Sequence, residues 1–87
     1  KASYLANEIN KLKNYNLIYN KNYFREIVIK SKNINASSIK EKLIKYNILI
    51  DVIKNDDKDK HLLIALTEKR TINEINNFLK ALEEVNR

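Results

Sequence analysis

The chain has 87 residues, which suits one domain that buries roughly 60 to 65% of the surface its unfolded form exposes. With no Cys and one His it cannot supply disulfides, a thiolate nucleophile, or a thiolate or His-rich metal site. It has no apolar run of the roughly 18 residues needed for a membrane span and no signal-peptide pattern, so we expect a cytoplasmic protein without membrane contact.

Apolar residues at helical spacing open the chain. Leu5, Ile9 and Leu12 form one stripe, which predicts a helix over residues 2–12. Asn14 follows this stripe in a chain that has no Gly. Asn tolerates the left-handed conformation better than most residues, so we expect a positive φ at Asn14 where the helix ends.

The next segment resembles a hairpin. Residues 17–19 and 23–30 are predicted strands, with a turn at 20–22, because aromatic and β-branched residues are enriched in strands. Stacking on nucleic-acid bases is an alternative role for the aromatic residues here, but no glycine-rich or RNA-binding motif accompanies them. Packing explains this group better: Tyr15, Tyr19, Tyr23 and Phe24.

A second helix follows the polar connector at residues 31–35. Ser38 and Glu41 have the spacing of a capping box, in which a Ser side chain and a Glu three residues later satisfy backbone N–H groups. Asn47 stands where a C-terminal Gly is common. The predicted buried stripe of this helix is Ile39, Leu43 and Tyr46.

Two strands and a third helix complete the chain. Residues 48–53 and 61–67 are predicted strands on either side of a charged loop at 54–60. Residues 62–66 form a continuous apolar run, which is typical of a buried strand. Thr71 and Glu74 again have capping-box spacing. The apolar stripe of the last helix is Ile72, Ile75, Leu79 and Leu82.

The predicted order is therefore helix, strand, strand, helix, strand, strand, helix. Short connections between neighbouring strands favour antiparallel pairing, and helices of this kind pack on a sheet. We expect an α+β fold in which three helices cover one face of an antiparallel sheet of about four strands. Residues 1–87 form a single domain in this interpretation, and one excised from a longer chain.

Four ordered motifs carry a resemblance to a known family. They are YLA at residues 4–6, NYFREIVIK at 22–30, EKLIKYNIL at 41–49 and LTEKRTINEINNFLKALEEV at 66–85. In order and spacing they resemble the C-terminal small domain of the glycine cleavage system P-protein, glycine dehydrogenase (decarboxylating) subunit 1. This family is a branch of the fold-type I pyridoxal phosphate enzymes, whose small domains are aminotransferase-like.

The resemblance implies a task for the chain. The parent enzyme would use pyridoxal phosphate to decarboxylate glycine and would pass an aminomethyl group to the lipoylated H-protein. The cofactor lysine and phosphate cup would lie in the large domain or in P-protein subunit 2. The chain itself would carry no catalytic or cofactor-binding residue, and would contact the large domain and subunit 2.

Some positions depart from the family pattern. Asn14 and Asn47 replace glycines, which conserves positive φ if both positions need it. Ile50 and Asp51 replace a glycine pair, so a contact that depended on close backbone approach there is not expected in this chain.

Four residues are candidate substrate or partner contacts. Arg70 precedes a helix N-terminus, where the helix dipole disfavours a cation, so we expect an ion pair with Glu68, Glu74 or another domain. Binding of a substrate or partner carboxylate is the alternative for Arg70. By spacing, Lys60 resembles the carboxylate-binding arginine of aminotransferases, although a solvated lysine is the simpler interpretation. His61 could transfer a proton near neutral pH, or be structural, and Glu68 could pair with Lys69 or Arg70.

The net charge of +6 allows an alternative function. A basic α/β module could bind nucleic acid, but its lysines are scattered among acidic residues and no motif supports this, so we do not expect nucleic acid as the partner. Lys, Asn and Ile together make up almost half the chain. Such a restricted composition would also fit a redesigned domain that keeps the fold and lacks activity.

Overall fold

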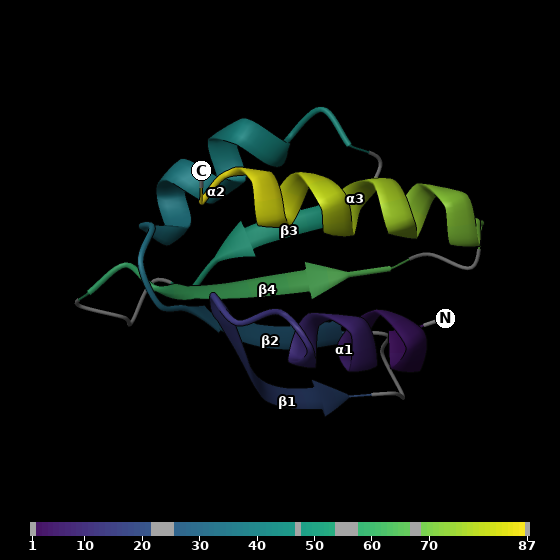
Figure 1. The fold of residues 1–87 in the computed structure, drawn as a ribbon, viewed down its shortest axis with the longest axis horizontal. Coiled ribbons are helices and arrows are strands. Elements are labelled where there is room, and N and C mark those ends of the chain that lie inside the picture. Colours follow the sequence, from purple (N-terminus) through teal and green to yellow (C-terminus); the bar gives the residue numbers. More distant parts are fainter. Residues whose placement is uncertain (1, 22–25, 47, 54–57, 67–68, 87) are drawn as a thin grey trace.

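The computed structural model describes residues 2–21, 26–46, 48–53, 58–66 and 69–86. Its elements follow one another in the predicted order (Figure 1). They are α1 (Ala2–Asn10), β1 (Tyr15–Lys21), β2 (Glu26–Ser31), α2 (Ala36–Leu43), β3 (Leu49–Val52), β4 (His61–Ala65) and α3 (Ile72–Glu84).

The four strands form one antiparallel sheet in the order β1-β2-β4-β3. β2 and β4 are the central strands, and β1 and β3 are the edges. The three helices lie on one face of this sheet (Figure 1). The predicted α+β fold, with its four-stranded antiparallel sheet, is therefore confirmed.

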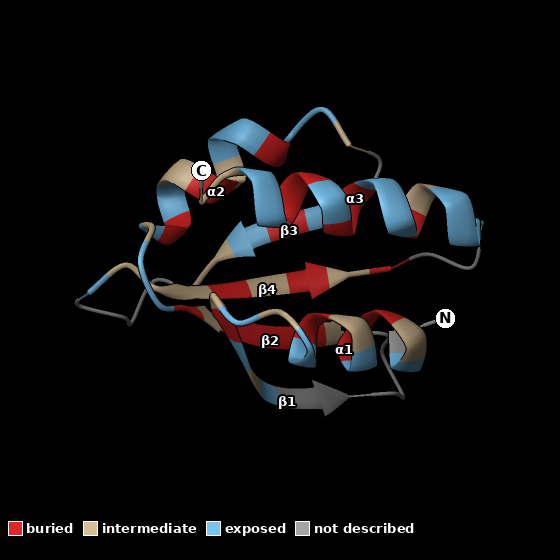
Figure 2. Ribbon diagram, in the orientation of Figure 1, coloured by how far each residue is buried: buried red, intermediate tan, exposed pale blue. Residues whose placement is uncertain are grey.

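The core lies between the sheet and the helices. Ile27 and Ile29 of β2 and Leu62 and Ile64 of β4 are fully buried, because alternate residues of a strand point to the same face. Figure 2 shows buried residues along β2 and β4 and on the helices. The helices contribute large buried side chains to the same cluster: Leu5, Ile9, Ile39, Leu43, Ile75, Phe78 and Leu82. Each side chain of this size contributes about 1.5 to 3 kcal/mol when it leaves water.

The capping box of α3 is confirmed. The Thr71 hydroxyl accepts a hydrogen bond from the Glu74 backbone N–H at 3.1 Å, and the Glu74 carboxylate accepts one from the Thr71 N–H at 3.0 Å. The predicted burial of Ile72 is wrong, because this side chain is 43% exposed. The first turn of α3 extends beyond the ends of the strands (Figure 1), and Phe78 is a fully buried residue of α3 that the prediction left out.

The predicted capping box of α2 is wrong. α2 begins at Ala36, and its N-cap residue Asn35 makes no side-chain capping bond, so Ser38 already lies inside the helix. Asp59 caps the helix instead. Its backbone carbonyl accepts from the Ala36 N–H at 2.5 Å, and its carboxylate accepts from the Ser37 N–H at 3.2 Å and from the Ser37 hydroxyl.

Asp59 is the residue with positive φ, at 54°, in the described part of the chain. The expected positive φ at Asn14 is therefore wrong, and Asn47 lies outside the described residues. Asn14 has a different role: its backbone carbonyl accepts from the Lys32 N–H at 3.0 Å, and its side-chain oxygen accepts from Asn33 at 2.9 Å. It thereby links the segment before β1 to the segment after β2.

The hairpin strands differ from the prediction at their ends. β1 starts at Tyr15 and continues to Lys21, with an irregularity in pairing between Leu17 and Tyr19. The predicted turn at 20–22 is thus wrong for its first two residues, and the third is not described. Ser31 pairs with Tyr15 and belongs to β2 rather than to the connector.

Other helices and strands are shorter than predicted. α1 ends at Asn10 and α2 at Leu43, so Leu12 and Tyr46 lie beyond the helices, partly buried against the core. β3 begins one residue later and ends one residue earlier than predicted, and β4 ends at Ala65.

Tyr15 links β1 to the C-terminal end of α3. It is 2% exposed, and its hydroxyl donates to the Leu82 carbonyl at 2.6 Å and accepts from the Asn86 side-chain amide at 3.0 Å. Burial raises the pKa of Tyr15 to about 12, because the charged phenolate is poorly solvated there. Packing therefore explains this aromatic residue, as expected.

Substitution of Asp59 tests the cap of α2. Asp59→Gly should lower the free energy of unfolding by about 1 kcal/mol, because the hydrogen bonds that the carboxylate accepts from Ser37 are lost. Asp59→Ala should cost about 1 kcal/mol more, because Ala disfavours positive φ. Urea unfolding of the 87-residue chain measures both, with the exposed Glu41→Ala on α2 as the control. Equal losses for Gly and Ala would contradict the role of the left-handed backbone.

Tyr15 should make stability fall at alkaline pH. Its pKa is about 12 in the folded chain and about 10 when unfolded. The folded state therefore holds the proton more tightly, and this contribution is complete below pH 10 and is lost between about pH 10 and 12. Urea unfolding should show a loss of about 2 kcal/mol across this range. Tyr15→Phe should be less stable at neutral pH and should show a shallower alkaline loss; an unchanged slope would contradict the assignment.

Candidate functional site

Arg70 lies between β4 and α3, directly before the N-cap residue Thr71. Its guanidinium donates to the Glu74 carboxylate at 2.9 Å, so the predicted ion pair with Glu74 is confirmed. This pair offsets the unfavourable position of a cation at a helix N-terminus. Glu74 thus serves both the cap and the ion pair.

The Arg70 guanidinium also has an unsatisfied donor. Its Nε is buried and has no hydrogen-bond partner among the residues that the structure describes. A buried donor without an acceptor costs about 1 to 3 kcal/mol. Arg70 therefore differs from an ordinary surface cation, and the connection between β4 and α3 is a candidate contact site.

Lys60 and His61 lie at the other end of β4 from Arg70 (Figure 1). The Lys60 ammonium donates to the Asn33 carbonyl at 3.1 Å and to the Asn35 side-chain oxygen at 3.0 Å. It therefore holds the connection that leads into α2. His61 is partly buried at the start of β4, where its backbone carbonyl accepts from the Ile53 N–H at 3.2 Å.

The described candidate residues do not converge on one site, because Lys60 and His61 lie at the start of β4 and Arg70 follows its end. Glu68 lies outside the described residues. Within the described ranges, no three His, Cys, Asp or Glu side chains group closely enough to hold a metal ion. In the same ranges, no helix has the length and apolar character to cross a bilayer.

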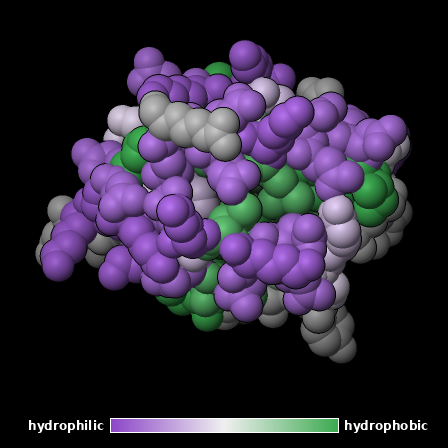
Figure 3. Space-filling view, in the orientation of Figure 1, coloured by the Kyte–Doolittle hydropathy of each residue, from purple (hydrophilic) through white to green (hydrophobic). Residues whose placement is uncertain are grey.

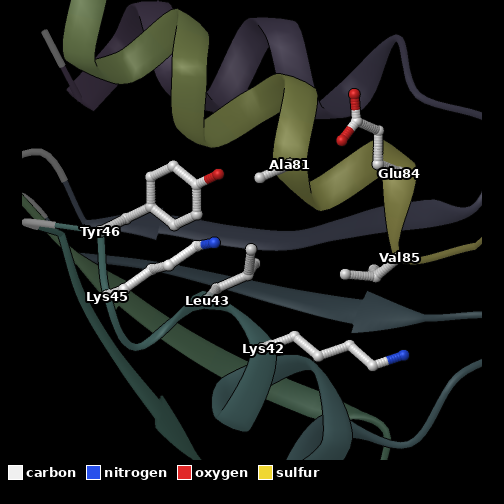
Figure 4. Close-up of a pocket in the computed structure, with 7 residues that line it drawn as sticks. All are labelled: Lys42, Leu43, Lys45, Tyr46, Ala81, Glu84 and Val85. Carbon is white, nitrogen blue, oxygen red and sulfur yellow. The ribbon is translucent and has the colours of Figure 1, made fainter.

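One pocket lies between the C-terminal ends of α2 and α3 (Figure 4). It has a volume of about 230 Å³. Leu43, Ala81 and Val85 supply apolar walls, and the Tyr46 ring packs edge-on against Phe78 with ring centres 6.4 Å apart. The remaining lining residues are charged: Lys42, Lys45 and Glu84.

The charges of this pocket do not form a reactive group. The Lys45 ammonium lies 5.7 Å from the centre of the Tyr46 ring, a cation–π distance. Lys42 points away from the other labelled side chains in Figure 4. The C-terminal ends of helices carry partial negative charge, which disfavours an anionic ligand.

A second pocket, of about 290 Å³, lies beside the edge strand β3. Lys40 of α2 and Asp51 of β3 form an ion pair at 3.0 Å in its lining. The other lining residues are apolar: Leu49, Ile50, Leu63 and Ala65. These residues are not a site that the sequence predicts. The available signal was the continuous apolar run in β4, which is typical of a strand covered on both faces.

Sequence comparison finds similar proteins that are much longer than this chain. A protein from Chloroherpeton thalassium is 41% identical over 85 residues, which are 98% of this chain and 19% of that protein. A protein from Chlorobaculum parvum is 35% identical over 94% of this chain and 18% of its own length. A Staphylococcus aureus protein is 42% identical over 72% of this chain and 14% of its own length.

All three of these proteins are named probable glycine dehydrogenase (decarboxylating) subunit 1. The chain spans about a fifth or less of their length. No family model matches the chain. No solved structure matches it either.

A double-mutant cycle tests the ion pair between Arg70 and Glu74. We expect Arg70→Ala and Glu74→Ala to couple by about 0.5 kcal/mol, because both side chains are partly exposed and four residues apart on one helix end. Urea unfolding at low and high salt measures the coupling, which should shrink as salt rises. A coupling near zero at low salt would show that the pair contributes nothing to stability.

Proposed function

We propose that this chain, which belongs to the glycine dehydrogenase (decarboxylating) subunit 1 family, is a small C-terminal domain of a longer subunit. The observation that carries the proposal is the 41% identity over 98% of the chain but only 19% of the relative. A match of this shape fits one domain of a larger protein. The single core shared by all seven elements supports an independent structural unit.

The complete enzyme, in this proposal, acts on glycine in the cytoplasm. It removes the glycine carboxylate as carbon dioxide and transfers the aminomethyl group to the lipoyl group of the H-protein. Pyridoxal phosphate supplies the electron sink for this chemistry. The partners of the chain are the large domain of the same subunit and subunit 2.

The described residues of this chain do not fit pyridoxal phosphate. The cofactor needs a lysine for its aldehyde and donors for its phosphate, commonly at a helix N-terminus. The pocket in Figure 4 lies instead at the C-terminal ends of α2 and α3. In the pocket beside β3, Lys40 is paired with Asp51. The cofactor therefore belongs to another part of the enzyme.

The proposed role of the chain is to support the enzyme by contact rather than by chemistry. Arg70 is the strongest candidate for a substrate or partner contact, because its buried Nε finds no acceptor within the described part of the chain. Lys60 is a weaker candidate, since its ammonium already has two acceptors within the chain. His61 and Glu68 remain proposed contacts.

Assay of the complete enzyme tests this function. The complete subunit, combined with subunit 2, pyridoxal phosphate and lipoylated H-protein, should release carbon dioxide from carboxyl-labelled glycine. A subunit that lacks this 87-residue segment should lose most of that activity, and the segment alone should have none. Alanine as substrate is the control for specificity.

Two results would contradict the proposal. Full activity without the segment would show that the segment is not needed by the enzyme. Steeply salt-dependent binding of RNA by the 87-residue chain would favour the basic nucleic-acid module instead, because phosphate contacts weaken as salt rises.

A further inference from the structure

Three neighbouring strands carry apolar residues on both faces of the sheet, but the helices cover only one face. Residues 27–29, 48–50 and 62–66 are continuous apolar runs that lie in or extend from β2, β3 and β4. Alternate residues of a strand point to opposite faces, so only about half of each run faces the helices. Strands with continuous apolar runs are typically covered on both faces. Here the helices cover only one.

Strand pairing brings the outward apolar residues together. Val28 pairs with Leu63, and Leu49 pairs with Ala65, so these residues are neighbours on the face without helices. Val28 is only 4% exposed yet is not part of the core cluster between sheet and helices. Leu49, in contrast, is 68% exposed. Val28 is therefore already covered within the chain, and we call the remaining group the outer apolar surface: Leu49, Leu63 and Ala65.

The outer apolar surface is also hollowed. The pocket of about 290 Å³ beside β3 is lined by its three residues, Leu49, Leu63 and Ala65. The ion pair between Lys40 and Asp51 lies at the same pocket. An apolar recess beside a charged pair is the usual arrangement of a protein contact with a polar rim.

The helix-covered side has a different character. Figure 3 shows that hydrophilic side chains dominate this side, with a narrow hydrophobic strip between α1 and α3. Ile44, directly after α2, is an exposed apolar side chain at 68%. Single exposed apolar residues are common on protein surfaces and need no partner.

We propose that the outer apolar surface is where the rest of the same polypeptide packs, through an apolar segment that fills the pocket beside β3. The argument for this occupant is length: about four-fifths of the first relative lies outside the part that matches this chain. The inference rests on the proposed function only in that the chain is part of a longer subunit.

A single cysteine introduced at each of two positions tests this packing. Leu49 and Ile44 have the same exposure, 68%, and lie on opposite layers of the domain, and the chain contains no native Cys. Leu49→Cys is the test variant, and Ile44→Cys is the matched control. Each is labelled with a thiol reagent in the 87-residue chain and in the complete subunit, and labelling is measured by peptide mass spectrometry.

In the 87-residue chain, both variants should label at similar rates. In the complete subunit, labelling of Leu49→Cys should slow about tenfold or more while Ile44→Cys keeps its rate, because a covered thiol does not react. Equal labelling of both variants in the complete subunit would overturn the inference. Protection of Leu49→Cys that disappears on dilution would also overturn it, because a second copy or another protein would then be the occupant.

The labelling result does not depend on catalysis. Protection of Leu49→Cys in a complete subunit that does not act on glycine would support the packing while the proposed function failed. Loss of protection in a fully active subunit would overturn the packing while the proposed function held. Leu49→Asp adds a second readout: it should lower the melting temperature of the complete subunit more than Ile44→Asp does, with little difference between the two in the 87-residue chain.

Discussion

The pairing of β2 with β4 is the interaction on which the rest of the structure depends. Each edge strand pairs with one of these two strands, and their inward residues lie under the helices. Val28 and Leu63, which point away from the helices, are also apolar. Hydrophobicity alone would therefore tolerate a shift of one residue in the register between β2 and β4. The charged ends of β2 exclude it: such a shift would turn Glu26 and Lys30 toward the core, at the cost of burying charge.

The absence of Gly imposes a second constraint. A chain without Gly must use another residue wherever the backbone needs a positive φ, and Asp is among the few that tolerate it. Asp59 combines this conformation with the cap of α2, so one residue meets two needs. Asn14 was the natural candidate from sequence, but the segment after α1 reaches β1 without positive φ.

The parts of the structure that the sequence predicted are those that depend on neighbours along the chain. The cap formed by Thr71 and Glu74 spans three residues, and the ion pair between Arg70 and Glu74 spans four, so spacing alone indicates both. The cap of α2 was missed because Asp59 lies 22 residues from Ser37.

The sequence predicts burial less well than these local contacts, because burial also depends on residues that are distant along the chain. Ile72 has the spacing of a core residue, but the helix extends beyond the strands at that point. Arg70 and Lys60 are candidate contacts because of their residue types and their positions along the chain, neither of which reveals burial or partners. Only the folded chain shows that the buried Nε of Arg70 has no acceptor among the described residues, and that Lys60 is held by Asn33 and Asn35.

Two features of the described residues favour contact with another polypeptide segment. Leu49 lies at the start of the edge strand β3, where it pairs with Ala65 and is 68% exposed. Arg70 lies on the connection from β4 to α3, and among the described residues its buried Nε has no acceptor. An apolar neighbour would stabilise the first feature, because it removes apolar surface from water. A carbonyl or carboxylate oxygen would stabilise the second, because a buried donor without an acceptor costs free energy.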